Sequence, residues 1–486
     1  MRDEEAILRI LSDENPWWAR GSGKRTSVPQ YRRRDFHILK RNLTGSRIIA
    51  VGGPRQVGKT TLLYQLIEEM LTSVEFDPRR VLYLAMDFPR LAQVTDEPLT
   101  DALDVYAERI IARPWRDLES TSYVFLDEVT KLRDWHRVLK GWFDRRLPLK
   151  FVVSDSSLPS LHKGIAESLI GRCDLFVVLP MKFVDVLMFH EGREEINDAS
   201  LRLRSSFQES VRKGSPTTFL TACRAAAGRL APMERRILAH LQSYIFTDGY
   251  PELLTTPGGA TATRRLREYL DLIFARDLVQ VFDIRNPRAL SALVAFLADR
   301  TADRFDYTGL AKNVGLSPDA TREYLDYLES SFVVLRSEFY TKSRASRLRK
   351  QKKLYFGNVG LANALTGNVG PQLFENREYL GRLIETLVAD HSKRLLYSLH
   401  PEKDSTLFYW RNYRGQEVDM VLNVDGRPIP LEVKYQPRIT NADRRPVLDF
   451  LSEEKKAPFG IIVTRETLGI DGDIVSVPLH LFLLMA

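Results

Sequence analysis

Apolar runs typical of buried strands alternate with helical repeats of apolar residues over the first part of the chain. A β-favouring run covers residues 47–51, and apolar residues then recur at helical spacing from Leu62 to Met70. Two more runs, at 123–126 and 149–153, have the length and composition of buried strands. Strands that alternate with helices in this way predict an α/β domain.

Between residues 287 and 340 the pattern indicates a helix-turn-helix. Three helices are expected, over 290–297, 307–314 and 319–331. Ser317 is a good N-cap and Pro318 suits a first helical position, so the third helix has a clear start. A β-like run over 332–335 follows it and suggests the wing of a winged helix.

The last part of the chain predicts a helix followed by a hairpin. Residues 380–388 have a helical pattern, with Glu385 on or near the apolar face. A strand over 407–411 comes next. Residues 416–422 and 429–434 are then expected to pair across a turn at Asp425-Gly426, a dipeptide typical of tight hairpins.

A phosphate-binding loop lies between the first strand and its helix. The motif GxxxxGK[ST] and the threonine after it comprise Gly53, Pro54, Arg55, Gln56, Val57, Gly58, Lys59, Thr60 and Thr61. Glycines let backbone N–H groups face the phosphates, and the helix N-terminus adds a favourable dipole. Lys59 would reach the β- and γ-phosphates of ATP, and the Thr60 hydroxyl would bind Mg²⁺. The strand–loop–helix context disfavours a chance match.

An acidic pair follows the second strand. Asp127 would lie beside the Mg²⁺, and Glu128 would polarise the attacking water as a catalytic residue. The third strand ends in Ser154-Asp155-Ser156-Ser157, where Ser156 could sense the γ-phosphate. The alternative is that these polar residues only form a turn.

These motifs resemble those of the archaeal-type AAA+ ATPases, a family that also occurs in bacteria. The resemblance rests on the P-loop, the acidic pair and the serine turn, and on three further elements: Gly171-Arg172, Asn15-Pro16-Trp17-Trp18 and Asp248-Gly249-Tyr250-Pro251-Glu252. It implies that Arg172 is a trans-acting or sensor arginine, with a surface or capping role as the alternative. Asp155 replaces the usual glycine of the serine turn, and Asn358 replaces an aspartate that the family tends to carry.

The resemblance also implies a winged helix and a C-terminal domain of the PD-(D/E)xK restriction-endonuclease-like fold. The predicted hairpin would bring Asp419, Glu432 and Lys434 to one end, with Glu385 as the helical acid. Asp419 and Glu432 would bind metal, and Lys434 would orient or activate water. All four residues would be catalytic in a nuclease. The alternative is an ordinary half-exposed strand, or a domain of this fold that only binds DNA.

The positive charge of the chain indicates a polyanionic partner. The net charge is +8, and seven of the thirteen residues of the segment 341–353 are Lys or Arg. Such density suits DNA phosphates, although a solvated loop is the alternative. Two cysteines, Cys173 and Cys223, fit a reducing cytoplasm. No apolar run is long enough for a membrane span.

The expected organisation has five parts. They are an N-terminal extension (1–45), a P-loop ATPase core (46–200), a helical lid or linker (201–285), a winged helix with a basic wing (286–355) and a nuclease-like domain (356–486). The leading hypothesis is a Mg²⁺-dependent ATPase that binds DNA, with nuclease activity at its C-terminal end. The alternative is an ATP-dependent DNA- or protein-binding switch with a catalytically inactive nuclease-like domain. AAA+ relatives commonly form rings, so a homo-oligomer is expected.

Overall fold

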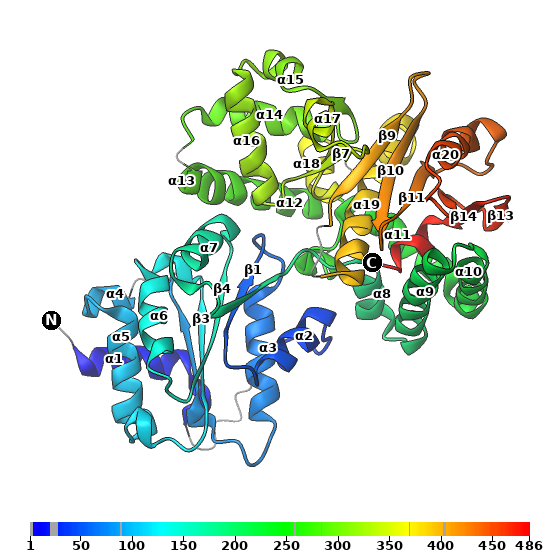
Figure 1. Cartoon of the computed structure of the whole chain (residues 1–486). Helices are drawn as coiled ribbons and strands as arrows, with labels where there is room; N and C mark the ends of the chain where they lie inside the picture. Colours follow the sequence, from blue (N-terminus) through cyan, green and yellow to red (C-terminus); the bar gives the residue numbers. More distant parts are fainter. Residues whose placement is uncertain are drawn as a thin grey trace. The chain divides into compact units, whose positions relative to one another are not determined.

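The computed structural model describes residues 3–19, 28–87, 90–256, 259–282, 284–368, 370–401 and 405–486, with the backbone alone at 275–277, 280, 281 and 371. Two compact units make up the chain, Met1–Leu179 and Pro180–Ala486. The first is blue to cyan in Figure 1 and the second green to red. Within the described ranges, no helix is both long and apolar enough to cross a lipid bilayer.

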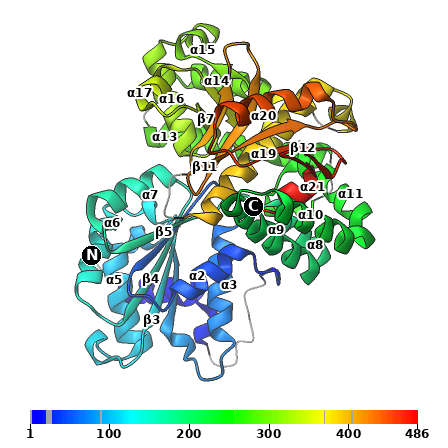
Figure 2. The same ribbon diagram turned by 45° about the vertical axis from the view of Figure 1, so that its right-hand side comes forward.

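The first unit is built on a parallel sheet of five strands in the order β2-β3-β4-β1-β5. The strands are β1 (Ile48–Gly52), β2 (Val81–Ala85), β3 (Ser122–Asp127), β4 (Leu149–Asp155) and β5 (Cys173–Val177). Helices flank the sheet (Figure 2), among them α1 (Glu4–Glu14), α2 (Arg34–Asn42), α3 (Lys59–Leu71), α6 (Trp135–Asp144) and α7 (Leu158–Gly164). The three predicted strands are confirmed.

Residues before the first strand hold the edge strand β2 in place. The Asn15 carboxamide donates to Tyr83 O over 2.9 Å and accepts from Tyr83 N over 2.6 Å, so it pairs with the strand as a neighbouring strand would. The indole N–H groups of Trp17 and Trp18 both donate to Val81 O. The N-terminal residues therefore complete the sheet of the first unit.

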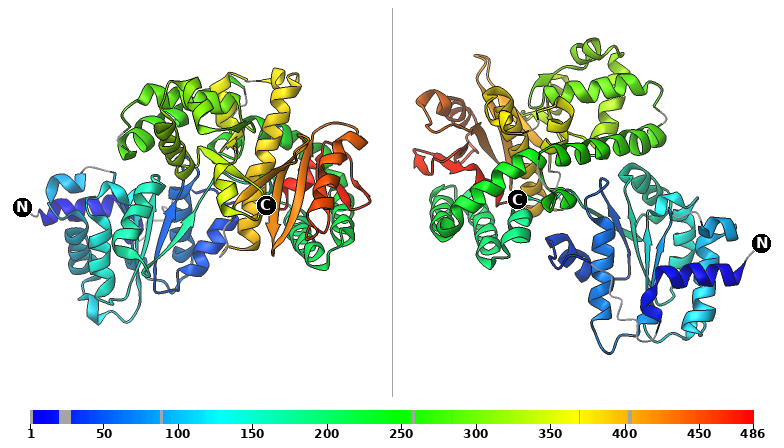
Figure 3. Two further views of the ribbon diagram at one scale, coloured as in Figure 1. Left: turned by 45° about the horizontal axis from the view of Figure 1, so that its top comes forward. Right: turned by 180° about the vertical axis from the view of Figure 1, so that it is seen from behind.

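The second unit begins with helices, which make up most of the described part of residues 200–285. They include α8 (Phe183–Glu191), α9 (Glu194–Lys213), α10 (Thr217–Leu230), α11 (Glu234–Thr247), α12 (Ala260–Leu272) and α13 (Val279–Phe282). Helices α9 and α10 pack side by side, and α10 and α11 both contact α21 (Leu479–Leu483) near the C-terminus (Figure 3).

The three helices expected between 287 and 340 are present as α14 (Pro287–Asp299), α15 (Tyr307–Val314) and α16 (Pro318–Ser330). The expected wing differs. Strand β7 (Val334–Phe339) pairs antiparallel with β8 (Lys352–Phe356) and parallel with β9 (Leu407–Arg411). Because both edges of β7 are hydrogen-bonded, it is an interior strand of a large sheet and not part of a free hairpin.

That sheet has nine strands in the order β13-β14-β12-β11-β10-β9-β7-β8-β6. The remaining strands are β6 (Arg304–Phe305), β10 (Glu417–Val424), β11 (Arg427–Lys434), β12 (Gly460–Thr464), β13 (Gly469–Asp471) and β14 (Ile474–Pro478). The predicted hairpin is confirmed: β10 and β11 pair antiparallel, and Asp425 and Gly426 both have positive φ at its turn. Helix α19 (Arg377–Leu399) packs against both strands.

Candidate functional site

The backbone of the predicted phosphate loop has the shape that its glycines allow. Gly53 has φ +152°, and a Cβ there would lie 2.0 Å from Val178 O, so no other residue fits without displacing the backbone. Gly58 (φ +92°) stands at the N-cap of α3, which begins at Lys59. The loop thus ends at a helix N-terminus, where the backbone N–H groups and the helix dipole favour an anion.

The side chains expected to bind nucleotide and metal meet at the carboxyl ends of β1 and β3. Lys59 Nζ donates to Gly53 O and Pro54 O, each over 2.9 Å. Thr60 Oγ1 donates to Asp127 Oδ2 over 2.6 Å. A hydroxyl and a carboxylate are oxygen ligands that suit Mg²⁺, so the residues present fit that ion.

Two further hydroxyl groups hold Asp127. Strand β4 lies between β1 and β3, and the Ser154 hydroxyl at its end donates to Asp127 Oδ1. The Tyr83 hydroxyl donates to Asp127 Oδ2 over 3.1 Å from the neighbouring strand β2. The Asp127 carboxylate is buried, and hydroxyl groups from three elements, α3, β2 and β4, fix its position.

Glu128 and Ser156 are also brought together. Glu128 has a left-handed backbone (φ 53°) just after β3, and Ser156 Oγ donates to its Oε2 over 2.9 Å. Asp155 instead accepts from Thr130 N and Ser157 N, over 2.8 and 2.7 Å. Burial, and then the charge of Glu128, raise the pKa of Asp155 to about 6. Ser156 thus orients the carboxylate predicted to polarise water.

Arg172 is not brought to the phosphate loop of its own chain. It precedes β5, which runs parallel to β1, and Ile48 N at the start of β1 donates to Arg172 O. Arg172 therefore lies at the amino edge of the sheet, about one strand length from the loop. Its side chain forms an ion pair with Asp144 over 2.8 Å.

The structure adds functional residues that the sequence patterns did not single out. Tyr83 is one, since nothing in its strand marks a partner for Asp127. Arg33 is another: it is 8% exposed and donates through Nη1 to Val57 O in the phosphate loop and through Nη2 to Leu179 O. The sequence marks Arg33 only by the basic residues around it. Clusters of basic residues are usually exposed to solvent, so this pattern does not indicate a buried contact with the phosphate loop.

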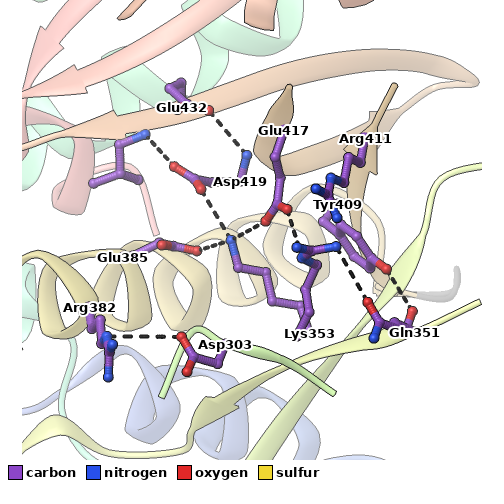
Figure 4. A network of polar contacts seen from close by, with 12 residues as sticks. Asp303, Gln351, Lys353, Arg382, Glu385, Tyr409, Arg411, Glu417, Asp419 and Glu432 are labelled. Carbon is purple, nitrogen blue, oxygen red and sulfur yellow. Dashed lines mark hydrogen bonds and ion pairs between the residues drawn. The ribbon is translucent and has the colours of Figure 1, made fainter. Parts of the chain in front are cut away.

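A second group of charged residues lies in the nine-stranded sheet and on helix α19. Lys353 Nζ of β8 is 2.6 Å from Glu385 Oε1, and 3.1 Å from both Glu417 Oε1 and Asp419 Oδ1 (Figure 4). Lys353 is 3% exposed. We call Lys353, Glu385, Glu417, Asp419, Glu432 and Lys434 the acidic cluster.

The four residues predicted for a nuclease site do come together in the acidic cluster. Asp419 Oδ2 accepts from Val433 N over 2.9 Å, and Glu432 Oε2 accepts from Asp419 N over 3.2 Å. Lys434 Nζ donates to Glu432 Oε1. Strand β10 and the end of β11 thus present their carboxylates to each other, as the hairpin predicts.

The pKa values of the carboxyl groups in the cluster diverge because of burial and neighbouring charges. Burial, and then the charge of Asp419, raise the pKa of both Glu385 and Glu432. Burial also acts to raise the pKa of Asp419, but the ammonium groups of Lys353 and Lys434 hold it below its usual value.

The acidic cluster does not fit a divalent cation in this arrangement. The Lys353 ammonium stands among the carboxylates of Glu385, Glu417 and Asp419, and Lys434 pairs with Glu432, so each predicted metal ligand already contacts a cation. Among the residues that the structure describes, no group of three or more His, Cys, Asp or Glu side chains is placed to hold a metal ion. The predicted role of Asp419 and Glu432 as metal ligands therefore finds no support in the geometry.

The predicted basic wing is only partly a free surface. Lys352 and Lys353 are buried, so neither is available to a phosphate. Arg344, Arg349 and Lys350 are exposed in the segment that contains α17 (Arg344–Arg349). The exposed part of the basic segment is therefore smaller than its sequence suggests.

Comparison with known families assigns the first unit. Residues 45–187 match the model of an AAA domain. Residues 238–372 and 380–482 match two domains of unknown function, DUF8612 and DUF4143. Together with the parallel sheet and phosphate loop, the first match shows that the chain carries an ATPase domain of the AAA type.

Two proteins are similar over most of the chain. The uncharacterized protein Rv2008c of Mycobacterium tuberculosis is 25% identical over 416 residues, which cover 85% of this chain and 76% of that protein. The uncharacterized protein MJ1544 of Methanocaldococcus jannaschii is 23% identical over 420 residues, covering 85% and 79%. The similarity thus extends beyond the ATPase domain.

Solved structures show weaker likeness. The Walker-type ATPase PABY2304 of Pyrococcus abyssi has a TM-score of 0.40 at 15% identity, covering 69% of this chain and 95% of that chain. The ORC1 protein of Aeropyrum pernix in complex with DNA has a TM-score of 0.30 at 12% identity, covering 76% and 97%. Neither likeness is close enough to carry a functional argument.

Proposed function

We propose that the chain is a Mg²⁺-dependent ATPase whose second unit binds DNA. The observation that carries the ATPase part is the contact between Thr60 and Asp127, 2.6 Å apart beside the phosphate loop of an AAA domain. A Mg²⁺ ion held there would neutralise the negative charge that develops on the phosphates. Thr60 and Asp127 hold the ion, and Lys59 contacts the β- and γ-phosphates.

Glu128 orients the attacking water in this proposal, and Ser156 keeps the Glu128 carboxylate in place through their 2.9 Å hydrogen bond. The test is ATP binding and steady-state hydrolysis. Lys59→Ala is expected to lose both, whereas Glu128→Gln should bind ATP and hydrolyse it at least about 100-fold more slowly. Full activity in Glu128→Gln would overturn the assignment of the water-orienting group.

DNA binding is assigned to the exposed cations at one end of the nine-stranded sheet. Strands β7 and β9 run parallel, so the basic segment after β7 and the turn after β9 leave the sheet at the same end. The segment supplies Arg344, Arg349 and Lys350, and the turn supplies Arg414 and the 86% exposed Tyr413. Cations around an exposed aromatic ring suit phosphates and a stacked base.

Helix α16 contributes less to this proposal than a recognition helix would. Its exposed face carries Asp319, Glu323 and Asp326, and Arg322 is the cation among them. An acidic face repels the phosphate backbone, so the proposed DNA surface lies on the basic segment and not on the helix-turn-helix.

The test of DNA binding is fluorescence anisotropy with labelled duplex and single-stranded DNA over a salt series. The triple variant Arg344→Ala, Arg349→Ala, Lys350→Ala should bind about 10-fold or more weakly, with a shallower salt slope. The matched control removes three exposed arginines from α9–α11, namely Arg202, Arg224 and Arg235. Equal weakening in both triples would show that only net charge matters, and the assigned surface would be wrong.

Nuclease activity is the second candidate function. The confirmed hairpin, which brings Asp419 and Glu432 together, favours it. The position of Lys353 favours the alternative, an ATP-dependent switch whose nuclease-like domain does not cleave. Incubation of wild type and Asp419→Ala with DNA and Mg²⁺ or Mn²⁺ separates them: cleavage that Asp419→Ala abolishes would establish the nuclease.

Arg172 enters the proposal only as a group that acts on a neighbouring subunit. It lies at the amino edge of its own sheet and its side chain is one-third exposed, which suits a trans role in a homo-oligomer. In mixtures of Arg172→Ala with Glu128→Gln, hydrolysis above the sum of the separate variants would support that role. If the mixtures show no such gain in hydrolysis, the trans role is wrong, and Arg172 only forms its ion pair with Asp144.

A further inference from the structure

One lysine in the acidic cluster contacts Asp419, one of the two residues that the nuclease-like interpretation assigns as metal ligands. Lys353 Nζ has carboxylate oxygens at 2.6, 3.1 and 3.1 Å, from α19 and from two residues of β10. Figure 4 shows the three side chains converging on it. An ammonium group has three donors, so these three acceptors saturate it.

The burial of Lys353 is selective. Its neighbour Lys352 is also buried in β8, but its Nζ donates to the backbone oxygen of Arg347 over 2.7 Å. Successive residues of a strand face opposite sides of the sheet, so only Lys353 faces the carboxylates. A buried ammonium is expensive unless it is paired, and here the pairing is complete.

The charge balance of the cluster leaves little room for a divalent cation. Glu385, Glu417, Asp419 and Glu432 are its carboxylates. Lys353 and Lys434 are inside it, and Arg304 forms an ion pair with Glu417 Oε2 over 2.8 Å. Three cations thus face four carboxyl groups, so the negative charge of the set is balanced by the protein's own side chains.

We propose that Lys353 is the built-in cation of the acidic cluster, so that this domain folds and functions without a divalent metal there. The Lys353 ammonium ties β8 to α19 and β10, as a bound metal would tie its ligands. This inference is independent of the proposed ATPase and DNA-binding activities, because no residue of the phosphate loop or of the exposed basic segment takes part in it.

The test measures Mn²⁺ binding to the full chain in the absence of nucleotide. The electron paramagnetic resonance signal of free Mn²⁺ reports how much of the ion stays unbound. All variants carry Asp127→Asn, which removes the carboxylate of the nucleotide site. With Lys353 present, no binding that depends on Asp419 is expected at millimolar Mn²⁺. Lys353→Met should gain about one site per chain, which the further change Asp419→Asn should abolish.

Lys352→Met is the matched control, since it removes a buried lysine from the same strand but not from the carboxylates. It should gain no site. The inference is overturned by Asp419-dependent Mn²⁺ binding with Lys353 in place, or by a folded Lys353→Met that gains no site. If Lys353→Met does not fold, the inference is tested by thermal unfolding of the Asp127→Asn chain, which retains Lys353. Mn²⁺ should not raise its Tm, and a rise that Asp419→Asn abolishes would refute the inference.

Discussion

The hydroxyl of Tyr83 donates a hydrogen bond to Asp127 Oδ2 across 3.1 Å, from one strand of the first sheet to the next. Tyr83 is itself held by the Asn15 carboxamide through both its backbone N–H and its carbonyl. The N-terminal residues, the edge strand and the proposed metal ligand are therefore connected by direct contacts.

Replacing Tyr83 by phenylalanine should weaken Mg²⁺ binding without destroying the fold. A group that orients a metal ligand typically contributes 10- to 100-fold in metal affinity. Because Ser154 still donates to Asp127, we expect the lower end, about a 10-fold rise in the Mg²⁺ concentration for half-maximal ATPase. Tyr106→Phe is the control, since its buried hydroxyl donates to Arg79 O, away from Asp127. Equal Mg²⁺ dependence in both variants would contradict the prediction.

Removing the Ser156 hydroxyl should slow hydrolysis and leave ATP binding nearly unchanged. The hydrogen bond to Glu128 is charge-assisted, and its loss should cost about 1.5 kcal/mol in orienting the carboxylate. We expect Ser156→Ala to lower kcat roughly 10-fold, with KM for ATP within about 2-fold of wild type. In the control Ser160→Ala, only a hydrogen bond to Ser157 is lost, and kcat should stay at the wild-type value. A γ-phosphate sensor would instead show a raised KM.

Truncating Asn15 should destabilise the first unit. Asn15→Ala leaves Tyr83 N and Tyr83 O without their partner in a buried site, which should cost about 2–4 kcal/mol of unfolding free energy. Urea unfolding followed by tryptophan fluorescence measures it, because five of the six tryptophans belong to the first unit. Asn42→Ala, which removes one hydrogen bond within α2, should cost under about 1 kcal/mol.

The sequence predicts the nucleotide site better than the acidic cluster for a physical reason. The phosphate loop is local: one strand, one turn and one helix start place Gly53 to Thr60, and the strand ending at Asp127 needs only a parallel sheet. The contact of Tyr83 with Asp127 depends instead on strand order. A side-chain hydrogen bond between neighbouring strands leaves no periodic signal in the sequence.

The acidic cluster shows where a local pattern misleads. Lys353 belongs to a run of seven basic residues in thirteen, and charge density alone predicts a solvated or DNA-contacting side chain. Its burial depends on α19 and β10 far along the chain. Asn358, which differs from the family pattern, is explained locally: its Oδ1 accepts from Leu361 N and caps the helix Val359–Thr366, as an aspartate would.

A buried histidine in the second unit should make its stability depend on pH. His480 is buried in α21, and burial lowers its pKa to about 4. Its Nδ1 has no hydrogen-bond partner among the described residues. In the unfolded chain a histidine has a pKa of about 6.5, so it binds a proton as the pH falls below that value. In the folded unit, His480 does not bind this proton until the pH approaches 4. Stability from this group is therefore complete above about pH 6.5 and falls as the pH drops toward 4.

His480→Leu should remove this dependence, because leucine keeps the apolar contacts and cannot be protonated. As the pH falls from about 6.5 to 4, we expect the free energy of unfolding of the variant to rise relative to that of wild type, by at most about 3 kcal/mol. At about pH 8 the two proteins should differ little. Urea unfolding monitored by far-ultraviolet circular dichroism at each pH measures the difference. A constant offset between the two proteins across this range would show that His480 is protonated equally in both states, and its burial would then have no part in the acid sensitivity of the second unit.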